Sequence, residues 1–170
     1  HITSKFDGYL KFDSVKAIKI TTDEGEKILS LGRSGTIQVL NNDNAVLTKY
    51  DVPYGAILQL PDGAQVKKGQ LLYEWDPYNS AIISEVQGTV KFIDLIPNIT
   101  YRDVNDEQTG HITKVVIDSR DKTKSPAIDI IDNEGRIIRS YSIPSRAQLR
   151  VDDNEIIGIG TSLAKIPRDL

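Results

Sequence analysis

Two adjacent lysines, Lys67 and Lys68, lie where a modified side chain could swing free of a β-fold. The stretch "DGAQVKKGQLLYEWDP" (62–77) combines turn residues, the two lysines, a glycine and an alternating pattern, which predicts a β-hairpin. A lysine at the tip of such a hairpin can carry a lipoyl or biotinyl arm. The motifs that flank a modified lysine, Met-Lys-Met or Asp-Lys-Ala, are absent from the sequence. We therefore interpret both lysines as exposed turn residues.

The other residues whose side chains could take part in catalysis or metal binding lack the partners that a site needs. His111 is one of two histidines in a chain without cysteine, so it supplies at most one metal ligand and has no obvious triad. The acidic cluster Asp152, Asp153 and Glu155 lacks the alternating ligands and the glycine of an EF-hand loop. A second acidic group consists of Asp103, Asp106 and Glu107. We predict no catalytic, cofactor-binding or metal-binding residue in this chain.

Two arginines, Arg146 and Arg150, are four residues apart on a predicted strand, so their side chains are expected to point to one face. Three roles stay open for this face: contact with nucleic-acid phosphates, contact with an acidic protein surface, and plain solubility. The net charge of -3 and the pI near 5.4 argue against a free-standing nucleic-acid binder.

The composition sets the class of protein that must position these residues. With 170 residues, 26% charged and 39% hydrophobic, the chain suits one ordinary soluble domain or two small ones. Its apolar runs are too short to span a bilayer and no signal-peptide pattern is present, so we expect no membrane partner. The chain has no methionine, which indicates a fragment of a longer protein.

The chain contains the same module twice. Residues 36–77 align without a gap with residues 127–168, at an offset of 91, and the matched pairs include Tyr50 with Tyr141 and Leu58 with Leu149. A weaker match pairs "GYLKF" (8–12) with "GTVKF" (88–92). The positions equivalent to Lys67 and Lys68 are Gly158 and Ile159, which also argues against a modified lysine.

Each copy shows the pattern of a β-protein. Short runs rich in β-branched, leucine and aromatic residues, such as "TIQVL" and "AVLTKY", alternate with turn residues, and no helical stripe with caps is present. This spacing predicts a sandwich or small barrel. We place the first module at 4–78 and the second at 79–168, and we predict that 97–110 is a loop insertion in the second.

A family resemblance rests on the order of several motifs. "YEWDP" (73–77), "GTVKFIDL" (88–95), "DEQTG" (106–110), "VVIDS" (115–119), "PAIDIID" (126–132) and "LAKIP" (163–167) occur in turn. Together they resemble the lineage-specific insert in the trigger loop of the bacterial DNA-directed RNA polymerase β′ subunit. The match covers about a hundred residues of the second half, and the first half enters through the repeat. The insert is built of sandwich-barrel hybrid modules, so the resemblance implies two tandem copies of that all-β fold.

The resemblance also implies a function. The insert is an accessory part of a nucleotidyltransferase whose magnesium-binding and catalytic residues lie elsewhere, so no functional residue carries over and no cofactor is expected in this fragment. We expect a cytoplasmic, non-catalytic domain that modulates elongation, pausing and transcript cleavage, with the polymerase core as partner. Downstream DNA is a further expected contact, through Arg146 and Arg150. The alternative is a carrier-like or adaptor β-module of an acyl-transfer or export system.

One departure from the family pattern concerns a turn. The first module keeps Pro53-Tyr54-Gly55, whereas the second has Pro144-Ser145-Arg146 in place of the expected Pro-Gly turn. The conformation of this turn in the second module is therefore open.

Overall fold

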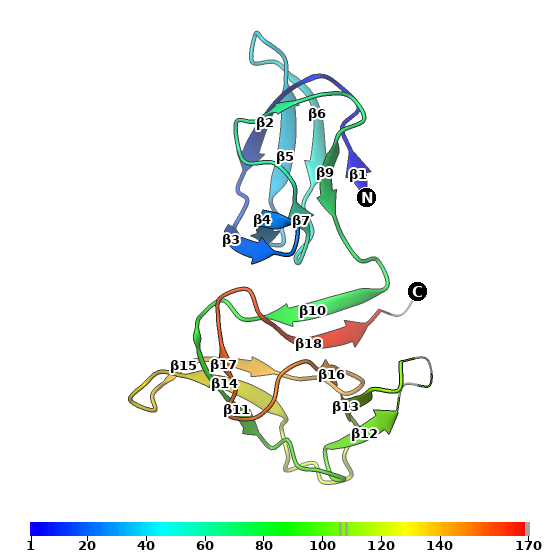
Figure 1. Ribbon diagram of the computed structural model, residues 1–170, viewed down its shortest axis with the longest axis vertical. Coiled ribbons are helices and arrows are strands. Elements are labelled where there is room, and N and C mark those ends of the chain that lie inside the picture. The colour runs from blue at the N-terminus through cyan, green and yellow to red at the C-terminus, as the bar shows by residue number, and fades with distance from the viewer. Residues whose placement is uncertain (106, 108, 169–170) are drawn as a thin grey trace. The chain divides into compact units, whose positions relative to one another are not determined.

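Two compact units make up the chain, His1–Asp76 and Pro77–Leu170 (Figure 1). The structure is a computed structural model, and it describes residues 1–105, 107 and 109–168. Every regular element in this described part of the chain is a β-strand, which confirms the all-β class. The described residues contain no helix of the length and hydrophobicity needed to cross a membrane.

The first unit contains two antiparallel sheets. The five-stranded sheet has the order β1-β9-β7-β4-β3 and the four-stranded sheet the order β6-β5-β2-β8. The strands are β1 (Ile2–Thr3), β2 (Gly8–Asp13), β3 (Ala17–Thr22), β4 (Gly25–Ser30), β5 (Thr36–Leu40), β6 (Val46–Asp51), β7 (Ile57–Leu58), β8 (Gln65–Val66) and β9 (Leu71–Glu74).

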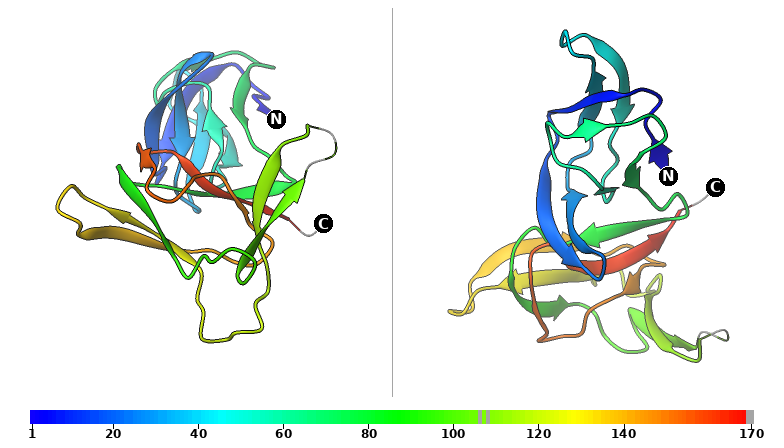
Figure 2. Two further views of the ribbon diagram at one scale, coloured as in Figure 1. Left: turned by 60° about the horizontal axis from the view of Figure 1, so that its bottom comes forward. Right: turned by 45° about the horizontal axis from the view of Figure 1, so that its top comes forward.

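The second unit repeats this topology strand for strand. Its five-stranded sheet has the order β10-β18-β16-β13-β12 and its four-stranded sheet the order β15-β14-β11-β17. The strands are β10 (Asn79–Ile83), β11 (Gly88–Ile93), β12 (Tyr101–Asn105), β13 (Ile112–Val116), β14 (Ala127–Ile131), β15 (Ile137–Ser142), β16 (Gln148–Leu149), β17 (Ile156–Ile157) and β18 (Ser162–Pro167). Figure 2 shows the β14–β15 hairpin, drawn in gold, extending out of this unit. The internal repeat predicted from the sequence is confirmed, and both sheet pairs fit the sandwich-barrel hybrid class.

Each unit has its own hydrophobic core between its two sheets. In the first unit, β2 pairs with β5 so that Leu10 lies opposite Val39, and both side chains are buried. In the second unit, β11 pairs with β14 so that Val90 lies opposite Ile130, and neither side chain is exposed to solvent. Side chains alternate along a strand, so these residues fix which face of each sheet is turned inward.

The turn after β5 and the turn after β14 use the same side-chain contact. The Asn41 Oδ1 atom accepts hydrogen bonds from the backbone N–H groups of Asp43 and Ala45, at 2.9 and 3.0 Å. The Asp132 carboxylate does the same for Glu134 and Arg136, at 2.9 Å each. These Asx turns close two equivalent hairpins. The bond from the Arg136 N–H is the main reason why the pKa of Asp132 lies below its ordinary value.

The loop insertion predicted at 97–110 is wrong in part. Residues Tyr101–Asn105 form β12, which pairs along its whole length with β13 and corresponds to β3 of the first unit. Arg102, Asp103 and Asn105 give this segment no apolar alternation, and the partner strand supplies the pairing that sequence propensity does not. Residues 106 and 108 of the predicted loop lie outside the described residues.

Three connections of the second unit are longer than their counterparts. They join β11 to β12, β12 to β13, and β13 to β14. Their extra length raises the offset between equivalent residues from 80, at Gly8 and Gly88, to 91, at Thr36 and Ala127. The second unit is therefore the same fold with longer loops around β12.

Candidate functional site

Lys67 and Lys68 lie in the turn that follows β8, and both side chains are exposed. The Lys68 N–H donates to an Asp7 carboxylate oxygen at 2.7 Å, and the Lys67 N–H donates to the Gln70 side chain at 3.0 Å. Backbone contacts of this kind define the turn without using either ammonium group. The interpretation that neither lysine is modified stays a prediction.

The acidic cluster after β16 is used by the fold. One Asp153 carboxylate oxygen accepts the Phe92 N–H at 2.9 Å, and a Glu155 carboxylate oxygen accepts the Asp152 N–H at 3.1 Å. Asp62 makes the equivalent contact to Phe12 in the first unit, also at 2.9 Å. These carboxylates hold a loop against a strand in both units. Among the described residues, no group of three or more metal-ligating side chains gathers at one place.

His111 and the described members of the second acidic group, Asp103 and Glu107, lie at exposed positions. His111 is exposed just before β13, and its N–H donates to the Thr109 hydroxyl at 3.2 Å. Asp103 is exposed on β12, Glu107 is exposed in the following turn, and Asp106 lies outside the described residues.

The structure places Arg146 and Arg150 on either side of a very short strand. Only Gln148 and Leu149 form β16, so the two arginines do not share one continuous strand as predicted. Arg146 lies in the turn before β16 with φ of +74°, the left-handed conformation that Gly55 adopts in the first unit with φ of +86°. Both turns are closed by a bond to the last residue of an earlier strand, β4 or β13, from Gly55 N–H to Ser30 O at 2.8 Å and from Arg146 N–H to Val116 O at 2.7 Å. The turn thus keeps its shape without the glycine.

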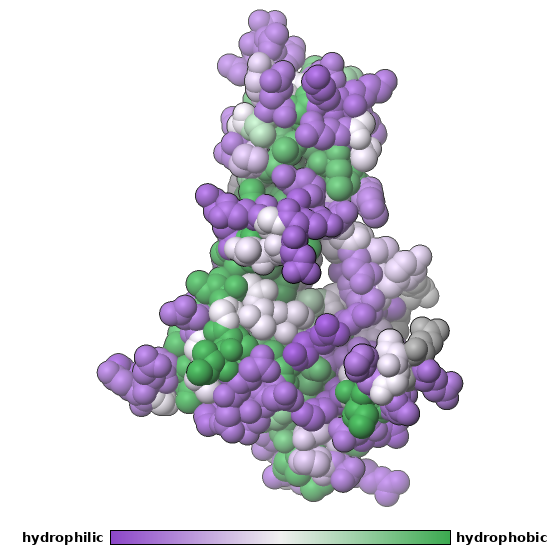
Figure 3. Space-filling view, in the orientation of Figure 1, coloured by the Kyte–Doolittle hydropathy of each residue, from purple (hydrophilic) through white to green (hydrophobic). Residues whose placement is uncertain are grey.

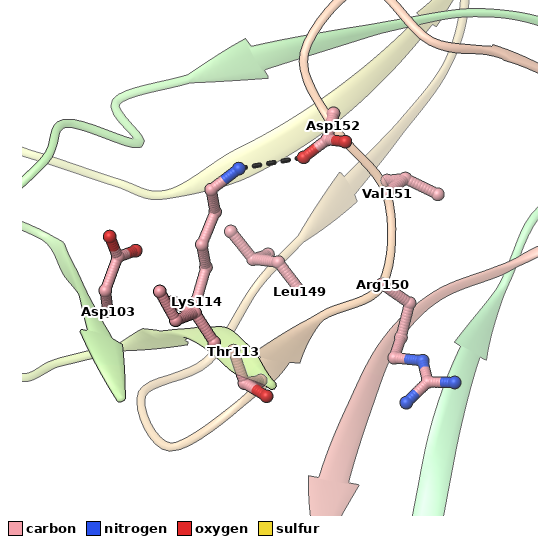
Figure 4. Close-up of a pocket in the computed structure, with 8 residues that line it drawn as sticks. Asp103, Thr113, Lys114, Leu149, Arg150, Val151 and Asp152 are labelled. Atoms are coloured by element: carbon pink, nitrogen blue, oxygen red, sulfur yellow. Dashed lines mark hydrogen bonds and ion pairs between the residues drawn. The ribbon is translucent and has the colours of Figure 1, made fainter. Parts of the chain in front are cut away.

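Arg150 borders a hollow on the β13 side of β16 (Figure 4). The hollow has a volume of about 460 Å³, and its lining includes Asp103, Lys114, Arg150 and Asp152. The Lys114 ammonium lies 2.8 Å from an Asp152 carboxylate oxygen, whereas the Arg150 side chain points away from this ion pair. The hydrogen bond to Asp152 is the main reason why the pKa of Lys114 is raised above its ordinary value. The ion pair with Asp152 therefore holds Lys114 as a cation at neutral pH.

Arg146 borders a second hollow, at the opposite end of β16. Its volume is about 490 Å³, and its lining includes Arg102, Val115, Asp118, Arg146 and Pro167. Asp118 is paired with Lys122 at 3.3 Å, a contact between two exposed side chains that is worth little. Two guanidinium groups beside aliphatic side chains can bind an anionic group of a partner.

The surface around these hollows mixes charge with exposed aliphatic residues. Figure 3 shows hydrophilic residues over much of both units, interrupted by hydrophobic patches. The exposed aliphatic residues near these hollows include Ile112, which lines the hollow of Arg150, and Val104 on β12. Arginines set among exposed aliphatic groups are typical of protein interaction surfaces.

Sequence reasoning found Arg146 and Arg150 but missed Arg102 and Lys165. Arg102 was assigned to a loop, so its place on a strand beside Arg146 was not visible. Lys165 lies at the position of Glu74 in the repeat, and this reversal of charge was the available signal.

Comparison with known proteins shows what the chain is similar to. No family model matches. Three curated relatives are DNA-directed RNA polymerase β′ subunits: that of Salinibacter ruber is 41% identical over 98% of this chain, that of Parabacteroides distasonis 38% over 98%, and that of Amoebophilus asiaticus 41% over 95%. The chain spans 11–12% of the length of these relatives. Nearly the whole chain is thus similar to one segment of the β′ subunit, which confirms the resemblance inferred from its motifs.

Proposed function

We propose that this chain is an accessory, non-catalytic segment of a bacterial RNA polymerase β′ subunit, inserted in the trigger loop. The observation that carries the proposal is the similarity of 98% of the chain to a segment that makes up about 12% of β′ relatives. A segment of this size that folds into two units with separate cores can be attached to a moving element without being part of its chemistry. In this proposal the domain is cytoplasmic and the polymerase core is its partner.

The proposed mechanism couples the contacts that the domain makes to the two positions of the trigger loop. A trigger loop that alternates between two positions must carry an inserted domain with it. Contacts that the domain makes in only one of these positions shift the equilibrium by their differential free energy. A difference of about 1.4 kcal/mol changes the ratio of the two states roughly tenfold, which is enough to alter pausing and transcript cleavage.

The first test removes the segment from a polymerase that contains it. We expect the assembled enzyme with a short glycine-serine linker in its place to add nucleotides, with altered pause lifetimes and altered transcript cleavage in single-round elongation assays. Complete loss of nucleotide addition in a correctly assembled enzyme would contradict an accessory role. Unchanged pausing and cleavage would contradict a regulatory one.

A matched control distinguishes the effect of the domain's specific contacts from the effect of its mass. An unrelated β-domain of similar size in the same position restores the load on the loop but none of the specific surface. We expect this enzyme to resemble the deletion, because the proposal attributes the effect to contacts of the domain. Recovery of normal pausing with the unrelated domain would assign the effect to mass alone.

Downstream DNA is a second candidate partner, supported by the two arginines beside β16. Arg146 and Arg150 are both exposed, and cationic side chains are the usual contacts to phosphate. Loss of salt-dependent DNA affinity in variants of these two residues would support this contact.

A further inference from the structure

A row of residues crosses the five-stranded sheet of the second unit on the side away from its core. Strand pairing places Arg102 opposite Val115, Val115 opposite Gln148, and Gln148 opposite Lys165. Paired residues share a face of the sheet, and the next residue along β16, Leu149, belongs to the core. The row that contains Arg102 and Lys165 therefore faces outward.

The equivalent row of the first unit has a different character. Its members are Ile18, Leu29, Ile57 and Glu74, paired in the same order across β3, β4, β7 and β9. Three of these side chains are aliphatic, and the last is an acid. The row therefore ends in an aliphatic residue and an acid in the first unit, and in two basic residues in the second unit.

Two flanking positions change in the same direction. Arg146 replaces Gly55, and Arg150 replaces Gln59, whose backbone makes the equivalent bond to β9. We call the four cations of the second unit the basic face: Arg102, Arg146, Arg150 and Lys165. These positions carry four positive charges in the second unit, whereas their counterparts in the first unit carry one negative charge. Each of the four cations thus stands where the first unit has a neutral or acidic residue.

The backbone of Arg146 adds an independent observation. A side chain with a Cβ atom is disfavoured in the left-handed region, and the first unit uses glycine at this turn. Strained backbone in a folded protein often accompanies a functional site. Arg146 accepts this conformation and places its guanidinium at the same hollow as Arg102.

The surroundings of the basic face favour a protein over a duplex. Asp118 lines the hollow of Arg102 and Arg146. A duplex carries a negative charge about every 1.7 Å along its axis, so it would bring phosphates against this carboxylate. A protein partner can place single carboxylates opposite the arginines and an apolar side chain against Val115.

We propose that the basic face binds a carboxylate-rich surface or segment of another protein. The hollow between Arg102 and Arg146 takes one carboxylate of the partner, because an arginine fork can bind both carboxylate oxygens. Lys165 lies three strands away from Arg102, about 14 Å at the usual strand spacing, and takes a second. Aliphatic side chains of the partner cover Val115 and Pro167 between these charges.

The test measures binding by the full chain at about 0.15 M salt, where exposed charges more than a Debye length apart are screened. The probes are a labelled peptide of alternating glutamate and valine, the same peptide with glutamine for glutamate, and a labelled DNA duplex, each followed by fluorescence anisotropy. We expect the glutamate peptide to bind more tightly than both other probes. The double variant Arg102→Ile with Arg146→Gly should weaken this binding by about tenfold or more.

The double variant installs residues that the first unit already carries at these positions, so its fold is expected to persist, and circular dichroism checks this. Arg139→Gln, on β15 in the other sheet, removes one positive charge away from the basic face, and this control should leave the affinity within about twofold, as exposed remote charges contribute little. Tighter binding of the duplex through the same arginines would overturn the proposal in favour of DNA. Equal binding of the glutamate and glutamine peptides, or affinity unaffected by the double variant, would overturn it outright.

Discussion

The hydroxyl of Tyr141 accepts a hydrogen bond from the backbone N–H of Glu85 at 2.9 Å, across 56 positions of the chain. In the first unit Tyr50 accepts the N–H of Lys5 at the same distance. A buried serine precedes each of these backbone groups, Ser4 and Ser84, and each serine hydroxyl donates to a carbonyl two residues later. The same contact thus anchors the first segment of each unit to the edge strand of the four-stranded sheet, β6 in the first unit and β15 in the second.

Replacing either tyrosine by phenylalanine removes this anchor and leaves a backbone N–H without its partner. We expect Tyr141→Phe and Tyr50→Phe each to lower the free energy of unfolding by about 1 kcal/mol, the usual net value of one hydrogen bond. Urea unfolding followed by circular dichroism measures this. Tyr9→Phe is the control, because the Tyr9 side chain is 42% exposed, and a loss there of the same size would contradict the explanation.

Gly8 and Gly88 lie where two strands approach too closely for a side chain. A Cβ atom at Gly88 would come within 2.5 Å of the Ile131 carbonyl oxygen, and one at Gly8 would collide with the carbonyl oxygen of Leu40. We expect Gly8→Ala and Gly88→Ala each to destabilise the protein by about 2–3 kcal/mol, because backbone must move to relieve the overlap. Thermal or urea unfolding gives the value.

The control for this pair is Gly158→Ala. A Cβ atom there meets nothing within 4 Å, and Gly158 is not among the residues with positive φ. We expect its unfolding free energy to stay within about 0.5 kcal/mol of the parent protein. A loss at Gly158 as large as that at Gly88 would show that the overlap with the Ile131 carbonyl oxygen is not the specific cause of the destabilisation.

Arg146→Gly is expected to stabilise the second unit. The substitution removes a Cβ atom from a residue with φ of +74° and gives the turn the residue that the first unit has at this place. The expected gain is about 0.5–1 kcal/mol, less than the full cost of a left-handed residue because glycine is more flexible in the unfolded chain. Arg146→Ala keeps the Cβ atom and should show no such gain. A destabilised Arg146→Gly would mean that contacts of the guanidinium outweigh the strain.

Much of the fold was predictable because the chain repeats itself. A gapless offset of 91 holds from β5 to β9, so every strand and turn of this stretch has a second copy that supports its assignment. β12 was missed because its sequence, Tyr-Arg-Asp-Val-Asn, has only two residues that favour strands, and its pairing partner β13 determines its conformation. The repeat did not help there, because the longer connections of the second unit break the alignment with β3.

The basic face was predictable from the sequence only in part, for a related reason. Arg146 and Arg150 are close in sequence and were grouped by spacing alone. Arg102 and Lys165 join them through strand pairing between β12, β13, β16 and β18, and such lateral contacts depend on sheet order. Sheet order is a property of the whole unit, so no local pattern around Arg102 indicates it.

The lysines of the β8 turn are expected to stay unmodified. Lys67 and Lys68 lie in a turn whose counterpart in the second unit has Gly158 and Ile159, and its backbone bonds to Asp7 and Gln70 involve no ammonium group. Co-expression with lipoate and biotin ligases followed by intact mass spectrometry should give the unmodified mass. A stoichiometric mass increase at either lysine would support the carrier-like alternative.

Tyr73 is expected to make the first unit sensitive to alkaline pH. Its side chain is buried, and its hydroxyl donates to the Asp51 carbonyl oxygen at 2.7 Å. Burial, together with the negative charge of Asp51, raises the pKa of Tyr73 above its ordinary value of 10.0. As the pH rises above 10.0, the unfolded chain releases this proton while the folded chain retains it, so the free energy of unfolding falls until the folded tyrosine also ionises.

Tyr73→Phe tests this directly, since phenylalanine has no proton to release. At neutral pH the variant loses the hydrogen bond to Asp51 and should be about 1 kcal/mol less stable than the parent protein. Above pH 10.0 the free energy of unfolding of the parent protein should fall more steeply than that of the variant, so the difference between the two free energies narrows. Urea unfolding at a series of pH values from 7 to 11 gives both curves, with Tyr9→Phe measured in parallel as the exposed control. A gap that stays constant across this range would show that Tyr73 does not determine the alkaline stability of the unit.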